Sequence, residues 1–171
     1  MLRWLIRRKL DAEEKKLGAS VDYLRHVVDV SPALFLRFAS ILPSANSRKR
    51  LPKEAWFVAQ IVGTQAEDCG TCVQITVNLA RQSGVDPALL RAALAGNCDE
   101  MSPEMVDVLE FTRSVIAATG DEGALRETLR KRYGERGLIE LSYAIASSRI
   151  PPTVKRCLGY AKSCSVVPVE V

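Results

Sequence analysis

Apolar residues recur along most of the chain at the spacing of one face of an α-helix. Val106, Leu109, Val115 and Ile116 have charged and polar residues between them, and residues 138–146 repeat the pattern. Such intervals predict amphipathic helices, and no sustained alternation of apolar and polar residues indicates a strand. The sequence therefore predicts an all-α protein, with helices over residues 2–17, 20–29, 32–42, 52–66, 69–83, 87–95, 103–119, 122–133, 135–149 and 152–162.

Residues with known capping preferences stand at several of these predicted boundaries. Ser31-Pro32, Asp86-Pro87 and Ser102-Pro103 each place an acceptor side chain directly before a proline. The acceptor binds free N–H groups of the first turn, where proline fits because no donor is needed from it. Glycine, which often ends a helix, stands where four of the helices should end. These residues are Gly84, Gly96, Gly120 and Gly134.

The composition fits one globular domain. Of the 171 residues, 47% are hydrophobic and 26% are charged, which is typical of a folded chain and excludes extensive disorder. The polar and basic segment from Ser44 to Arg50 predicts a linker. We therefore expect a basic N-terminal helical extension over residues 1–50, a helical core over residues 51–165 and an extended tail over residues 166–171.

The net charge of +4 is unevenly distributed. Residues 1–50 carry 11 Lys and Arg against 5 Asp and Glu, whereas residues 51–171 carry 13 against 15. Because large apolar and basic side chains are interleaved at the start of the chain, residues 1–17 predict a weak contact with an anionic membrane surface. The alternative is a basic arm that packs on the core or on another subunit. Nucleic acid is not expected as a partner, since no recognised binding module accompanies the basic residues.

The sequence predicts a cytoplasmic protein, with a location peripheral to the membrane as the alternative. The longest uncharged runs, residues 55–66 and 69–80, have 12 residues each and are too short to span a bilayer as a helix. The basic start of the chain is not followed by the apolar core and cleavage site of a secretory signal. In a reducing compartment, paired cysteines are more often redox-active or metal-bound than structural.

The motif Cys69-Gly70-Thr71-Cys72 is the strongest candidate for chemistry in the sequence. It stands where a helix is expected to begin, so residues three apart are neighbours and the two sulfur atoms are within reach of a disulfide. A helix N-terminus also favours the thiolate, which is the nucleophilic form. Glu67 and Asp68 oppose that effect. The pair is therefore predicted to be redox-active.

Two other interpretations of the cysteine pair stay open. The pair could be buried and inert, as free cysteines often are. It could also belong to a structural zinc site, which would need two further ligands. The candidates for those ligands are Cys98, Cys157, Cys164 and His26.

Several segments resemble the carboxymuconolactone decarboxylase superfamily, and within it the alkylhydroperoxidase AhpD-like branch. They are a helix that carries Glu54, the Glu-Asp-Cys-Gly-Thr-Cys stretch at 67–72, the Ser-Gly-Val-Asp-Pro-Ala-Leu-Leu stretch at 83–90, and residues 137–149. The resemblance covers roughly residues 51–160 and implies an AhpD-like helical bundle that assembles as a homo-oligomer, either a trimer or a hexamer. It also implies that Cys72 attacks a peroxide, that Cys69 resolves the sulfenic acid as a disulfide, and that a dithiol reductant recycles the pair.

The chain departs from the pattern of this family at the residues that would move protons. The glutamate expected 12 residues before the first cysteine is Phe57 here, and the two histidines near the cysteines are replaced by Thr71 and Thr76. Threonine cannot replace histidine as a base near neutral pH. Glu54 is the candidate for the missing role, with Glu67 and Asp68 as alternatives.

The resemblance and the motif together predict a thiol–disulfide oxidoreductase or a weak hydroperoxide reductase. Its predicted catalytic residues are Cys69, Cys72 and Glu54, and it needs no cofactor and no metal. The alternative is a non-catalytic helical assembly protein that kept the fold and lost the proton relay. A third alternative, chemistry on a small organic acid, rests only on analogy with the decarboxylase branch.

Overall fold

The computed structural model describes residues 1–42, 48–162 and 169–171, and within them it is all-helical, as predicted. Three helices form an N-terminal group: α1 (Leu2–Leu17), α2 (Asp22–Val30) and α3 (Pro32–Ile41). The core contains α4 (Lys53–Ala66), α5 (Gly70–Gln82), α6 (Pro87–Ala95), the 3-10 helix η2 (Cys98–Glu100), α7 (Pro103–Ala117) and α8 (Gly123–Cys157).

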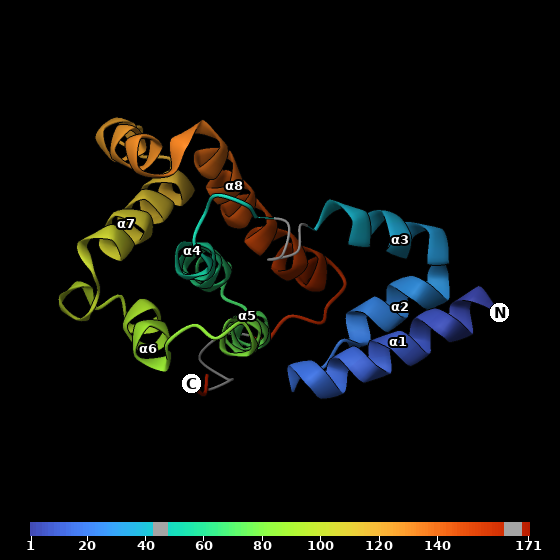
Figure 1. The fold of residues 1–171 in the computed structure, drawn as a ribbon. Coiled ribbons are helices and arrows are strands. Elements are labelled where there is room, and N and C mark those ends of the chain that lie inside the picture. The colour runs from blue at the N-terminus through green and yellow to red at the C-terminus, as the bar shows by residue number, and fades with distance from the viewer. Residues whose placement is uncertain (43–47, 163–168) are drawn as a thin grey trace.

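Helix α4 is the central helix of the core. Nine of its residues are buried, among them Trp56, Phe57 and Ile61, because apolar side chains occupy nearly its whole circumference. Figure 1 shows α5, α6, α7 and α8 arranged around it. The main apolar cluster therefore runs from α4 outward to every other core helix.

Helices α4 and α8 approach each other closely at Gly63. A Cβ atom at this position would lie 1.9 Å from Oγ of Ser148. Only glycine leaves room for this crossing, so Gly63 sets the distance between the two helices.

The predicted break between residues 149 and 152 is wrong. Helix α8 continues through Pro151 and Pro152 to Cys157, and its one non-helical residue is Gly134, where φ is 72° and the axis bends. Each proline lacks a backbone N–H and so removes one helical hydrogen bond. Because the two prolines are adjacent, both missing hydrogen bonds fall within a single turn. Pro152 is buried, so the turn that contains the prolines belongs to the packed part of the helix. Helix α8 also ends earlier than the predicted residue 162.

The N-terminal group has its own small apolar cluster, formed by Ile6, Leu10, Val21 and Val28. Helices α1 and α2 are further joined by Arg25, whose guanidinium group pairs with three carboxylates of these helices. Figure 1 shows the group beside the core, next to the C-terminal half of α8 and to α5. The first 42 residues thus form a compact three-helix unit, which we call the N-terminal unit.

Glu140 on α8 holds the segment that leads into the core. Its buried carboxylate accepts hydrogen bonds from the backbone N–H groups of Lys49, Arg50 and Leu51, at 2.9–3.0 Å. Arg136 adds an ion pair at 3.0 Å. Of the predicted linker Ser44–Arg50, residues 44–47 lie outside the described residues, and the rest is fixed to α8 by this carboxylate.

The end of the chain is also held on the core. Both Val169 and Val171 pack against the main apolar cluster. The side-chain amide of Gln74 exchanges two hydrogen bonds with the backbone of Glu170, at 2.8 and 3.0 Å. Residues 166–168 of the predicted tail lie outside the described residues. No helix in the described part of the chain is long and apolar enough to cross a membrane.

Candidate functional site

The cysteine pair stands at the start of α5, as the sequence predicts. Cys69 is the N-cap residue, and its carbonyl oxygen accepts the first two backbone hydrogen bonds of the helix, from Cys72 and Val73. The Sγ atoms of Cys69 and Cys72 are 2.8 Å apart and both cysteines are free. This separation exceeds the roughly 2.05 Å of a disulfide bond, so no disulfide joins the pair in this structure, and one thiol is close enough to donate a hydrogen bond to the other sulfur.

The surroundings of the pair favour a thiolate. The hydrogen bond from the Cys72 side chain lowers the pKa of Cys69 most, burial opposes it, and the Cys72 backbone N–H and the positive charge of Lys155 lower it further, to about 6. At neutral pH the Cys69 side chain is therefore mostly in its thiolate form. Cys69 is completely buried, whereas Cys72 is 5% exposed. A molecule that reaches the pair would therefore meet Cys72 first.

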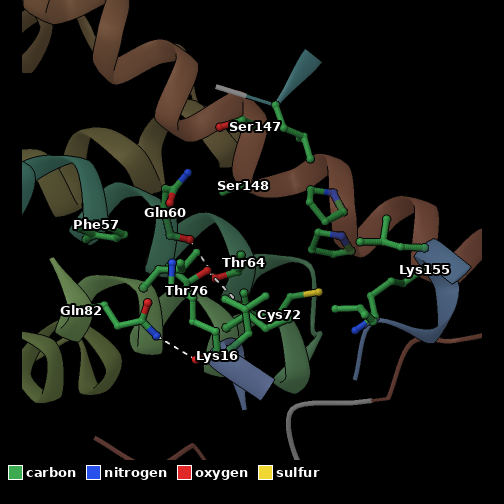
Figure 2. A pocket seen from close by; sticks show the side chains of 18 of the residues that line it. Lys16, Phe57, Gln60, Thr64, Cys72, Thr76, Gln82, Ser147, Ser148 and Lys155 are labelled. Atoms are coloured by element: carbon green, nitrogen blue, oxygen red, sulfur yellow. Dashed lines mark hydrogen bonds between the residues drawn. The ribbon is translucent and has the colours of Figure 1, made fainter. Parts of the chain in front are cut away.

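Cys72 lines a cavity of about 660 Å³. Figure 2 shows Gln60 and Thr64 of α4, Thr76 of α5 and Ser147 of α8 around the same cavity. Most of the remaining wall is apolar. A cavity of this size and character is typical of a site for a small molecule.

The N-terminal unit closes one side of this cavity. Lys16 and Leu17 of α1, Val21, and Tyr23 and Leu24 of α2 all belong to its lining. The sequence analysis named no residue of this part of the chain as a site residue. In the structure it contributes to the wall of the cavity next to Cys72.

Two side-chain amides of α5 hold α1 in place over the cavity. Asn78 donates to the carbonyl oxygen of Leu17 at 2.6 Å, and Gln82 donates to that of Lys16 at 2.9 Å. These carbonyls belong to the last turn of α1, where no intrahelical donor is available to them. With Gln74, the two amides form a row with four-residue spacing along α5, so this face of the helix binds backbone segments from both ends of the chain.

The structure places Glu54 apart from the cysteine pair. It lies in the first turn of α4, about 18 Å along the axis from the last residue of that helix. Its carboxylate is 3.9 Å from Nζ of Lys53, and it does not line the cavity. Glu54 is therefore not in contact with either sulfur in this conformation.

Glu67, the first alternative to Glu54, is bound by two arginines of α8. Its carboxylate is 2.6 Å from Nε of Arg149 and 3.3 Å from the guanidinium group of Arg156. Burial alone raises the pKa of Glu67, but the hydrogen bond and charge of Arg149, followed by those of Arg156, outweigh it and lower the pKa. Glu67 is thus a paired carboxylate that fastens the α4–α5 loop to α8. Asp68, the second alternative, is exposed and has a φ of 47°.

Two of the three positions where the chain departs from the family pattern lie on the cavity wall. Phe57 and Thr76 both line it, and the Thr76 hydroxyl donates to the carbonyl oxygen of Cys72 at 3.0 Å. Thr71 lies between the cysteines, with its hydroxyl oxygen 3.9 Å from Sγ of Cys69. The only histidine, His26, contacts the Tyr160 hydroxyl at 3.2 Å and does not line the cavity.

The other cysteines are not gathered around the pair. Cys98 is the first residue of η2 and lies 3.9 Å from a carboxylate oxygen of Glu110, and Cys157 is exposed at the end of α8. Cys164 lies outside the described residues. Among the described residues, no group of three or more His, Cys, Asp or Glu could hold a metal ion.

Lys155 and Tyr23 are site residues that the sequence analysis missed. Lys155 is only 3% exposed, and its ammonium group lies 5.4 Å above the centre of the Tyr23 ring. Burial and the nearby charges of Cys72 and Cys69 raise the pKa of Tyr23, so its hydroxyl stays protonated. Nothing in the sequence separates Lys155 from Arg156 beside it. Its position becomes informative only when α8 is known to continue through the prolines.

Comparisons of the chain with models of protein families, with curated proteins and with solved structures give no significant match. The site must therefore be interpreted from its own geometry.

Proposed function

We propose that the protein is a dithiol oxidoreductase that reduces hydroperoxides through Cys69 and Cys72. The observation that carries this proposal is the pair of free cysteines, whose Sγ atoms are 2.8 Å apart and of which Cys72 lines a cavity. Two supports accompany it: the pKa of Cys69 near 6 and the buried ammonium group of Lys155 close by. An inert cysteine pair in an apolar core would have neither.

A proton transfer between the two sulfur atoms supplies the activation for which the sequence lacks a histidine. The Cys69 thiolate accepts the proton of Cys72, which leaves Cys72 as the nucleophile at the cavity. Its sulfur attacks one peroxide oxygen, the O–O bond breaks, and the alkoxide takes up the proton from Cys69 and leaves as an alcohol. The product is a sulfenic acid on Cys72.

The second step closes the disulfide. The Cys69 thiolate attacks the sulfur of Cys72, the S–O bond breaks, and hydroxide takes up a proton from solvent and leaves as water. The pair has then given two electrons to the peroxide. An external dithiol reductant restores both thiols by thiol–disulfide exchange.

Hydroperoxide turnover with a recycling dithiol tests this function. The wild type is compared with Cys72→Ser, and Cys157→Ser is the matched control because Cys157 is exposed and distant in sequence from the pair. We expect turnover to be lost in Cys72→Ser and unchanged in Cys157→Ser. Equal turnover by the wild type and Cys72→Ser would refute the proposed activity.

A second candidate function, a non-catalytic assembly protein, is favoured by a separate observation. The N-terminal unit leaves large apolar side chains exposed on α1, at the end of α2 and on α3: Leu2, Trp4, Leu5, Val30, Leu34 and Ile41 are each at least 52% exposed. Such a group of exposed apolar residues is typical of a contact surface. We propose that this surface supports self-association of the protein or a weak contact with an anionic membrane.

Replacing Leu2, Trp4 and Leu5 together by serine tests the surface without disturbing the buried residues of α1. Oligomer size is measured by sedimentation, and binding is measured with vesicles that contain an anionic lipid. A change in either supports a contact role for α1, and Cys72→Ser should change neither. If the triple variant behaves as the wild type in both assays, α1 has no such role.

A further inference from the structure

The cavity beside the cysteine pair has an unusual distribution of charge. Three cationic residues line it, Lys16, Arg48 and Lys155, whereas no Asp or Glu of the described residues does. Lys16 lies at the surface, where water solvates its charge. Lys155 is 97% removed from solvent. The buried carboxylate of Glu67, at the start of the same loop as the cysteines, is paired with Arg149 and Arg156 and not with Lys155.

A buried ammonium group needs compensation for its lost hydration. The ring of Tyr23, 5.4 Å from Nζ, supplies a part of it. The Cys69 thiolate supplies another part, but only while the pair is reduced. When the disulfide forms, that negative charge disappears and Lys155 keeps only the aromatic ring. The cavity in front of it is the space from which a further anion can approach.

The walls of the cavity indicate what the rest of such a ligand looks like. Leu24, Phe57, Ile75 and Leu79 supply apolar surface from α2, α4 and α5. Figure 2 shows Cys72 and Lys155 on one side of the cavity, with Phe57 and Gln82 on the opposite side. A ligand with one charged end at Lys155 would therefore extend its remaining length over apolar residues.

We infer that the cavity binds an amphipathic carboxylate, with its carboxylate group on Lys155 and an unbranched hydrocarbon chain along the apolar wall. Such a ligand would lie within reach of Cys72, so a hydroperoxide of this amphipathic carboxylate class would be the substrate of the pair. In this one respect the inference rests on the proposed function. Binding itself requires no thiol chemistry. The ligand class and the redox activity can therefore be tested separately.

The test measures the binding of decanoate and of decanol by titration calorimetry, at neutral pH, to the full chain with both Cys69 and Cys72 replaced by serine. The two probes have the same hydrocarbon chain and differ in the charged group. We expect decanoate to bind at least tenfold more tightly than decanol, because only decanoate can pair with the buried ammonium group.

Lys155→Met identifies the residue responsible. Methionine has a similar length and is readily accommodated in a buried site, so the variant should fold. We expect it to bind decanoate at least tenfold more weakly and decanol within twofold of the parent. Lys131→Met on the same helix, at an exposed position that does not line the cavity, should leave both affinities unchanged.

Equal affinity for decanoate and decanol, or decanoate binding that survives Lys155→Met, would overturn the inference. The absence of measurable decanoate binding would overturn it as well. None of these results bears on the redox activity, since the protein used lacks both thiols. Loss of turnover in Cys72→Ser, in turn, carries no information about this ligand.

Discussion

Replacing Glu140 by glutamine should produce a loss of stability that depends on pH. The carboxylate is only 7% exposed and accepts hydrogen bonds from three backbone N–H groups and from Arg136. Burial alone raises the pKa of Glu140, but the N–H groups of Leu51 and Arg50, then Arg136 and Lys49, outweigh it and hold the pKa at about 2. The structure thus binds the ionised form much more strongly than the protonated one.

The magnitude follows from the difference between the folded and unfolded states. The pKa falls from an ordinary 4.5 to about 2, and each unit corresponds to about 1.4 kcal/mol, so the ionised Glu140 contributes about 3 kcal/mol to the free energy of unfolding. Because the folded-state pKa is lowered, this contribution is fully present above about pH 5 and is lost as the pH falls toward 2.

Urea unfolding of the wild type and Glu140→Gln, measured at several pH values from neutral to acid, checks this expectation. The difference in unfolding free energy should be about 3 kcal/mol at neutral pH and below about 1 kcal/mol near pH 2. Glu135→Gln is the matched control on the same helix: its side chain is 71% exposed, so its effect should stay within about 0.5 kcal/mol. A difference between wild type and Glu140→Gln that does not change with pH would refute the reasoning.

Two further predictions concern the helix crossing and the thiol pair. Gly63→Ala should lower the free energy of unfolding by about 2 kcal/mol in a thermal or urea denaturation, because the new Cβ would collide with Ser148, whereas Gly123→Ala, in open space, should not destabilise. In a protein whose other three cysteines are replaced by serine, the thiolate absorbance should appear with a midpoint near pH 6. Cys72→Ala should move the Cys69 midpoint upward, since it removes the thiol hydrogen bond to that sulfur, and an unchanged midpoint would contradict this cause.

Most of the helices could be predicted from the sequence because their signals are local. The predicted boundaries 2–17 and 87–95 agree with α1 and α6, and capping side chains begin three helices as expected, including Asp86, whose carboxylate accepts from the N–H of Ala88. A helix boundary depends on side chains within one or two turns of it. Such information is present in any short stretch of the chain.

The path of α8 shows where local signals fail. Two adjacent prolines ordinarily favour a helix boundary before them. Here Pro152 is buried in the folded protein, and the helix continues through both prolines. The prediction was wrong because packing outweighed a local preference.

The candidate site likewise contains some features that follow from the local sequence and others that depend on packing between distant segments. The position of Cys69 and Cys72 at a helix start follows from the residues around them. The contribution of Lys155 and Tyr23 does not, since it depends on the N-terminal unit packing beside α8 and α5. The amides of Asn78 and Gln82 are four residues apart and so lie on one face of α5, but the carbonyl groups that they bind are evident only from the structure.

The proposed activity requires Cys69 and Cys72 to act as a redox pair. The most direct measurement equilibrates the wild type in buffers with increasing ratios of oxidised to reduced dithiol, tags the remaining thiols, and maps the tags by mass spectrometry. We predict that Cys69 and Cys72 lose their thiols together, in one two-electron step, and are recovered in a peptide that contains their mutual disulfide. If both thiols stay reactive under the most oxidising buffer, or if they become linked only to other cysteines, Cys69 and Cys72 do not form a redox pair.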